Sequence, residues 1–155
     1  YEASGSLLRL LPLIAIAGQT LPVPFSKQQA TDVWSGLSDS FSKEDKEKRA
    51  SRLLVLLSAM GIESREGAWK NIISSSNIFE KENIPATAIR YQLRDAARNN
   101  RIAEVVSLSL IMLGAEGPSK SGLVALNAVI RSLREIGLEA DAREIAIEAA
   151  ISYVN

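Results

Sequence analysis

The stretch 126–154 constrains the fold most, because each half of it has an apolar face too large for an isolated helix. The first half has apolar residues at helical spacing: Leu126, Val129, Ile130 and Leu133, with Ile136 nearer the turn. Gly137 follows, and glycine readily adopts the left-handed conformation that ends many helices. The second half has small residues at helical spacing, with Ile145 and Ile151 beside them: Ala142, Ala146, Ala149 and Ala150. Small side chains allow close helix packing, so we expect a tight helical hairpin.

This stretch resembles the tetratricopeptide repeat, a family of helical hairpins. The family places a glycine before the turn and small residues five, nine and twelve positions later, which here are Gly137, Ala142, Ala146 and Ala149. Its large apolar positions in the first helix fall on Leu126, Val129 and Leu133. Two features depart from the pattern: Ile130 stands where a small residue is expected, and no proline follows the second helix. The resemblance implies stacked hairpins whose first helices line a concave groove.

Weaker copies of this pattern occur earlier in the chain. The segment LSAMGIESREGAW parallels LREIGLEADAREIA, with a leucine-bearing helix, a glycine, an acidic turn and a second helix. The expected turn residues Gly61, Asn100 and Gly137 are separated by 39 and 37 residues, a period found in helical-repeat arrays. We therefore predict one all-α domain over residues 1–155, a short right-handed α-solenoid of about seven or eight helices in antiparallel hairpins.

Composition narrows the possible functions. The chain has 155 residues, and only 5% are aromatic, which favours helix-on-helix packing. Lys and Arg total 18 and are balanced by 18 Asp and Glu, so a strongly basic nucleic-acid surface is not indicated. The chain has no Cys and no His, which removes thiolate chemistry, the commonest general base and the commonest metal ligand. We expect a non-enzyme without cofactor or metal.

The N-terminal part contains the most apolar run, residues 7–17. This run contains Arg9 and Pro12 and is shorter than the roughly 20 residues that span a bilayer. We expect residues 1–24 to form a buried, proline-broken helix followed by a proline-rich linker, with a targeting remnant ending in Ala15-x-Ala17 as the alternative. Because the chain begins with Tyr, we expect a fragment of a longer bacterial protein, soluble in the cytoplasm or periplasm; the compartment itself is unknown.

Helix boundaries are marked along the rest of the chain. We predict helices beginning at Ser26, Ser42, Ser64 and Pro85. The helix from Ser42 ends at Gly61, and the helix from Pro85 runs to about Asn99. Residues 102–113 are apolar almost all round, which predicts a central helix covered on several sides.

Two segments could carry chemistry. Residues 114–121, GAEGPSKS, nearly match the phosphate-binding loop G-x-x-x-x-G-K-[ST], but Ser119 replaces the glycine before the lysine. This leaves a nucleotide-binding switch as one alternative function, for which residues 102–113 would have to form a strand. Glu63-Ser64 resembles the catalytic Glu-Ser of lytic transglycosylases, which leaves a region that processes cell-wall glycans as a second alternative.

The candidate partner-binding site is a polar face on two helices in equivalent repeat positions. It comprises Arg90, Arg94, Arg98, Asn127, Arg131 and Arg134. Guanidinium groups in such rows can bind carboxylates through paired hydrogen bonds. We therefore predict a non-catalytic scaffolding module that binds protein or peptide, with an acidic segment or a C-terminal carboxylate as ligand, and no nucleic acid.

Overall fold

A computed structural model describes residues 10, 12–18, 42–62 and 87–151, and within these ranges all regular structure is helical. Residues 12–16 form a short helical segment. The longer helices are α3 (Lys43–Ala59), α5 (Thr87–Arg98), α6 (Ile102–Leu113), α7 (Leu123–Glu135) and α8 (Glu139–Ile151). The predicted all-α class with helical hairpins is therefore confirmed for the described residues.

The start of α3 follows from one side chain. Ser42 has extended backbone angles, φ −61° and ψ 156°, and its Oγ accepts a hydrogen bond from the Asp45 backbone N–H at 3.1 Å. This bond satisfies one of the N–H groups that a helix leaves without a partner at its start. The predicted beginning of this helix is confirmed.

The three expected turn residues all adopt left-handed backbone conformations. Their φ angles are 72° at Gly61, 53° at Asn100 and 83° at Gly137. Each turn has the same pair of backbone hydrogen bonds: the left-handed residue donates to the carbonyl three positions back, and the next residue donates five positions back. This is the Schellman motif, in which a left-handed residue satisfies the last carbonyls of a helix. The sequence therefore located three helix ends correctly.

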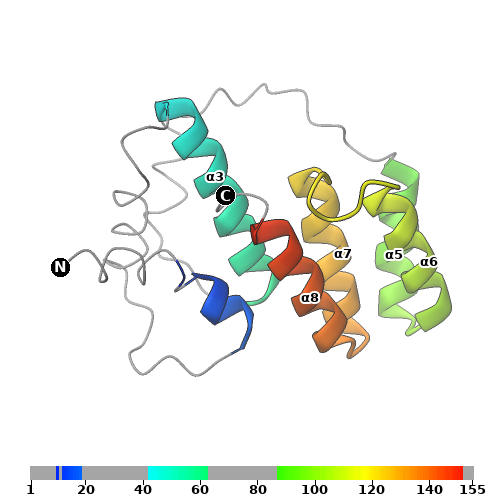
Figure 1. Ribbon diagram of the computed structural model, residues 1–155. Coiled ribbons are helices and arrows are strands. Elements are labelled where there is room, and N and C mark those ends of the chain that lie inside the picture. Colours follow the sequence, from blue (N-terminus) through cyan, green and yellow to red (C-terminus); the bar gives the residue numbers. More distant parts are fainter. Residues whose placement is uncertain (1–9, 11, 19–41, 63–86, 152–155) are drawn as a thin grey trace.

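The described helices pack around α7, which lies between α3 and the α5–α6 pair (Figure 1). α5 pairs with α6 and α7 pairs with α8 as hairpins, and α7 also packs against both α5 and α6. On its other side, α7 contacts α3, which reaches α8 as well. In Figure 1, α5 and α6 lie at one end, α7 and α8 in the middle, and α3 at the other end.

This spatial order differs from a stack built in chain order. A sequential array would place α3 beside the α5–α6 hairpin, whereas α3 packs on the last hairpin, α7–α8. The predicted centre was also wrong: α7 is central, and α6 lies at the edge with residues such as Leu110 exposed. α7 takes the centre because its buried residues reach neighbours on several sides.

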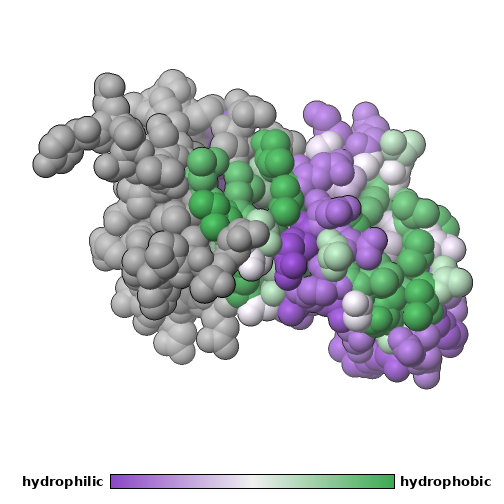
Figure 2. All heavy atoms as spheres, turned by 60° about the horizontal axis from the view of Figure 1, so that its bottom comes forward, coloured by the Kyte–Doolittle hydropathy of each residue, from purple (hydrophilic) through white to green (hydrophobic). Residues whose placement is uncertain are grey.

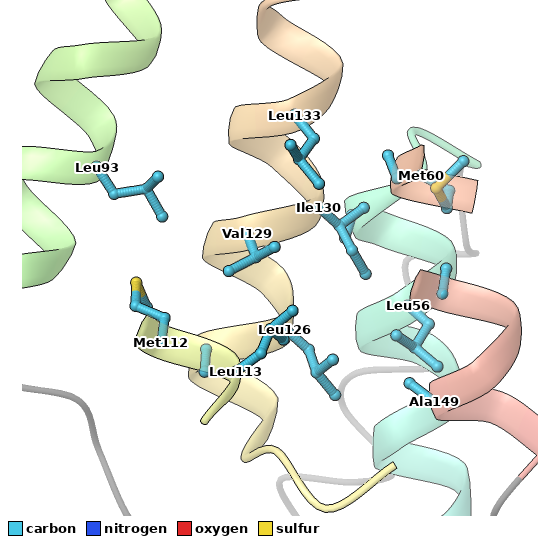
Figure 3. Packing of buried hydrophobic residues seen from close by; sticks show 14 of the residues in the cluster. Leu56, Met60, Leu93, Met112, Leu113, Leu126, Val129, Ile130, Leu133 and Ala149 are labelled. Atoms are coloured by element: carbon cyan, nitrogen blue, oxygen red, sulfur yellow. The ribbon is translucent and has the colours of Figure 1, made fainter. Parts of the chain in front are cut away.

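The core is continuous from α5 to α3 (Figure 3). α7 contributes the residues at its middle, which are Leu126, Val129, Ile130 and Leu133. Leu93 of α5 and Met112 of α6 approach them from one side, and Leu56 of α3 and Ala149 of α8 lie on the other. Ile16 of the short N-terminal helical segment is fully buried in the same core, as expected for a buried helix there.

Some predictions lie outside the described residues. These are the helix starts at Ser26, Ser64 and Pro85, the Pro-rich linker, and the Glu63-Ser64 pair. Among the residues that are described, no helix has both the length and the apolar character needed to cross a membrane.

Candidate interaction site

Arg90, Arg94 and Arg98 form a row along the exposed side of α5. Leu93, Ala96 and Ala97 are buried on the adjoining side, which packs against the rest of the protein, and the three arginines remain exposed. With a rise of 1.5 Å per residue, the row is about 12 Å long. Within the described part of the chain these three guanidinium groups have no ion pair or side-chain hydrogen bond. The row is therefore a set of cations without internal partners.

Arg131 adds a fourth exposed cation on α7, the helix that packs beside α5. It too has no ion pair or side-chain hydrogen bond within the described part of the chain. Asn127, one turn earlier on α7, is half-buried and so contributes less surface than expected. The structure thus has exposed arginines on two helices that pack against each other, α5 and α7.

Arg134 departs from the expected site because it is engaged inside the protein. Its Nε donates to Glu139 Oε2 at 2.9 Å, and its Nη1 donates to the carbonyl oxygen of Ala59 at 2.9 Å. Ala59 is the last residue of α3, where helix carbonyls lack intrahelical partners and a cation is favourable. Arg134 also lies against Gly61, where an added Cβ would be 2.8 Å from Nη1. Arg134 joins α7 to the end of α3 and is not a free ligand-binding group.

Arg143 has a similar position against the N-terminal segment. Its guanidinium covers Gly18, where an added Cβ would be 2.8 Å from Cζ, and its Nη2 is 3.6 Å from Glu139 Oε1. Glu139 therefore lies between Arg134 and Arg143, each of which covers a left-handed glycine after a helix. These contacts hold α3 and the segment 12–18 against the last hairpin.

Sequence reasoning missed Arg52, the most buried charged side chain among the described residues, at 5% exposed. Its Nε donates to the Ala149 carbonyl near the end of α8 at 3.3 Å, and its Nη1 donates to the Ser121 carbonyl at 3.0 Å. Its Nη2 donates to the carbonyls of Pro118 at 2.9 Å and Ser119 at 3.2 Å. Its spacing could have predicted this burial, because Arg52 lies on the same side of the helix as the apolar residues Leu56 and Ala59.

The 114–121 loop is built around Arg52 and does not have the expected phosphate-binding geometry. Its carbonyls point at a cation, whereas a phosphate loop directs backbone N–H groups at an anion. The Lys120 and Ser121 N–H groups bond within the loop, to Gly117 and Pro118 carbonyls at 3.3 Å. The preceding segment is the helix α6, not a strand. The observations that would favour a nucleotide switch are therefore contradicted.

A pocket of about 310 Å³ lies beside this loop, between α5, α6 and α7. Its polar side chains are Glu116, Lys120 and Ser121, and its apolar side chains include Ile89 and Met112. The Ser121 hydroxyl is already within 2.8 Å of the Leu113 and Gly117 carbonyls. No group of three acidic residues able to hold a metal ion occurs in the part of the chain described.

Arg101 lies on the same hairpin as the arginine row, but its charge is paired with two carboxylates. It lies 2.6 Å from Asp95 Oδ2 and 2.6 Å from Glu104 Oε2. The hydrogen bond that the Arg101 guanidinium donates to Asp95 Oδ2, together with the negative charge of Glu104, raises the pKa of Arg101. The contrast with the unpaired row on α5 marks that row as the candidate site.

The fold and the arginine row define an all-α protein with helical hairpins and an exposed cationic surface. No family model matches the chain, and neither a curated protein nor a solved structure matches it. The tetratricopeptide resemblance therefore remains an expectation based on the residues of its last hairpin.

Proposed function

We propose that this chain is a non-catalytic interaction module that binds an acidic protein segment across α5 and α7. The observation that supports this most is the row Arg90, Arg94 and Arg98, which is exposed and lacks partners in the described structure. Arg131 on the adjacent helix widens the cationic surface. An isolated group of like charges costs stability through mutual repulsion, so its presence is best explained by an anionic ligand.

The spacing of the arginines along α5 favours, as ligand, a segment with several carboxylates over a single C-terminal carboxylate. Arginines four residues apart are about 6 Å apart along the helix axis. Carboxylates four residues apart on a partner helix repeat at the same distance, and alternate residues of an extended peptide repeat at nearly the same distance. A single carboxylate would use one or two guanidinium groups and leave the others unpaired.

We further propose that α5–α6 and α7–α8 are two units of a tetratricopeptide-like repeat. The packing of α7 against both helices of the preceding hairpin supports this. α3 then occupies the place of the first helix of a following hairpin, although it comes earlier in the chain. This repeat would put the first helices, and with them the arginines, on one surface.

The test measures binding of a fluorescent peptide containing six glutamates by anisotropy. We compare the wild type with the double variant Arg94→Glu/Arg131→Glu. The double variant should bind at least about 30-fold more weakly, since two attractive charges become repulsive. The wild-type affinity should fall as salt rises, because exposed charges are screened over about 8–10 Å.

Lys120→Glu is the matched control, since Lys120 is an exposed cation in the α6–α7 loop. Lys120→Glu reverses a charge that does not belong to the arginine row. Its affinity for the peptide should stay within about twofold of the wild-type affinity. A pull-down from the native organism with the same three proteins then identifies the partner. Equal peptide binding and an unchanged set of captured proteins in the double variant would show that the row is only solvated surface.

A further inference from the structure

The outward side of α6 is apolar along its whole length. Ile102 is 48% exposed, Val106 39%, Leu110 65% and Ile111 61%. Ala103 and Ser107 complete this side, and the Ser107 hydroxyl donates to the Ala103 carbonyl of its own helix at 2.8 Å. None of these six residues is charged. We refer to residues 102, 103, 106, 107, 110 and 111 as the α6 face.

The α6 face is too apolar to be explained as ordinary surface. A helix that is apolar all round is normally covered on all sides, but among the described helices α5 and α7 pack against α6 and leave its outward side exposed. The exposed apolar area is about 400 Å², in the range of about 300–600 Å² at which the largest patch on a monomer is often functional. Figure 2 shows hydrophobic surface at the α5–α6 end of the molecule, with hydrophilic surface beside it.

We infer that a second copy of this chain covers the α6 face, with the two α6 helices antiparallel about a two-fold axis near Val106 and Ser107. A two-fold contact uses the same surface twice, so it requires a face that is complementary to itself. This inference concerns a different surface from the arginine row and does not depend on the proposed function.

Side-chain size makes the α6 face self-complementary. With the axis between Val106 and Ser107, Ala103 lies opposite Leu110 of the second copy, and Ser107 lies opposite Val106 of the second copy. Small residues therefore meet large ones, which allows the helices to interdigitate. Ile102 and Ile111 meet at the two ends of the contact. A parallel arrangement about an axis along the helices would place Leu110 against Leu110 and Ala103 against Ala103.

Charge also permits this contact. Near the N-terminal end of α6, the two cations Arg98 and Arg101 are equal in number to the carboxylates of Asp95 and Glu104, both of which pair with Arg101. At the C-terminal end, Glu116 is balanced by Lys120. An antiparallel pair brings these two ends together without net like charge, and places the positive end of one helix dipole beside the negative end of the other. A membrane surface fits less well, because helices that lie in the interface carry Lys and Arg along their polar side.

The size of the face predicts a weak, reversible dimer. Two α6 faces with their rims would bury about 1,000–1,200 Å², at the low end for specific protein interfaces. We therefore expect a dissociation constant on the order of 10 µM. Sedimentation should show monomer at about 1 µM and mostly dimer at about 100 µM.

Variants on the α6 face test the contact directly. Val106→Glu or Leu110→Glu would place two carboxylates in the apolar contact and should weaken dimerisation at least about 30-fold. Neither should change the melting temperature at 1 µM, because both side chains are exposed in the monomer. Ile151→Glu is the matched control: Ile151 is 46% exposed on α8, and its replacement should leave dimerisation unchanged.

Cross-linking tests the position of the axis, since the chain has no Cys of its own. In Ser107→Cys, two thiols beside the axis should form an intersubunit disulfide when diamide removes two electrons and two protons. Glu144→Cys, an exposed position on α8, should not cross-link under the same conditions. Cross-linking at 107 and loss of dimer in both α6 variants would support the proposal.

Four outcomes would overturn it. The first is a chain that stays monomeric up to about 1 mM. The second is a dimer that survives Val106→Glu and Leu110→Glu. The third is equal cross-linking of Ser107→Cys and Glu144→Cys, which would mean collision without a defined contact. A monomeric chain that binds a different protein through Leu110 would also exclude the second copy as the occupant.

Discussion

Three arginines in this protein bind or cover the ends of helices other than their own. Arg134 donates to the last residue of α3, Arg52 donates to the Ala149 carbonyl near the end of α8, and Arg143 covers Gly18 after the segment 12–16. Helix carbonyls at these ends lack intrahelical partners and carry partial negative charge. Arg134 and Arg52 therefore satisfy carbonyls, and all three guanidinium groups join segments far apart in the chain.

Arg52 should be the arginine with the largest effect on stability. Replacing it by Met keeps much of the apolar stem but removes the donors to Ala149, Ser121 and the loop carbonyls. Hydrogen bonds from a charged group contribute about 1.5–3 kcal/mol, and buried carbonyls without partners add a cost. Arg52→Met should lower the free energy of unfolding by about 2–4 kcal/mol, measured by urea denaturation.

Arg52→Lys is the comparison variant. An ammonium group cannot reach the α8 carbonyl and the loop carbonyls at once, so Lys should recover less than half of the loss. If Arg52→Met unfolds within about 0.5 kcal/mol of the wild type, the buried guanidinium does not stabilise the loop.

At the scale of elements, the last hairpin follows most directly from its residue types. Ala142, Ala146 and Ala149 are all fully buried, as their spacing predicted. Small side chains at these positions allow α8 to pack closely on α7 and α3. By contrast, α6 is apolar on nearly all sides although it lies at the edge of the molecule. Its composition therefore led to the wrong prediction that it is the central helix.

Ala146→Leu tests the close packing of α8. Ala146 is 0% exposed, so the added atoms would have to displace α7 or α8, at a cost of about 1–3 kcal/mol. Glu144→Leu is the control, because Glu144 is exposed on the same helix and Leu is also a good helix former. The measurement is the midpoint of thermal unfolding; equal midpoints for the two variants would contradict the packing of Ala146.

At the scale of the whole molecule, the order of helices in space differs from their order in the chain. α7 is central, and α3 packs against the last hairpin. This arrangement makes the contacts of α3 with α7 and α8 long-range, so their formation requires closing a large loop. The N-terminal part of the chain is therefore held by the C-terminal hairpin.

Spin-label distances test this order, and the absence of Cys makes specific labelling possible. Labels at Lys48 on α3 and Glu148 on α8 should be closer together than labels at Lys48 and Ala88 on α5, because α3 packs against α8 whereas α7 packs against both α3 and α5. The reverse order of distances would indicate a stack built in chain order. Circular dichroism of each labelled variant should match the wild type, which controls for misfolding.

For the candidate site, the sequence predicted which side of α5 carries its arginines but not which arginines remain free. Helical spacing alone placed Arg90, Arg94 and Arg98 on one side of the helix. Arg134 looked equivalent by spacing, yet its guanidinium bonds to Ala59 and Glu139. That pairing depends on the position of α3, which spacing along α7 does not contain.

Local physics explains what the sequence determined by itself. The cap at Ser42, the left-handed turns at Gly61, Asn100 and Gly137, and the buried alanines of α8 all depend on residues within a few positions of one another. The choice of neighbours was decided by the tertiary structure. Which helix is central, which face stays open and where Arg52 finds its carbonyls depend on contacts between segments far apart, for which many pairings satisfy the same apolar pattern.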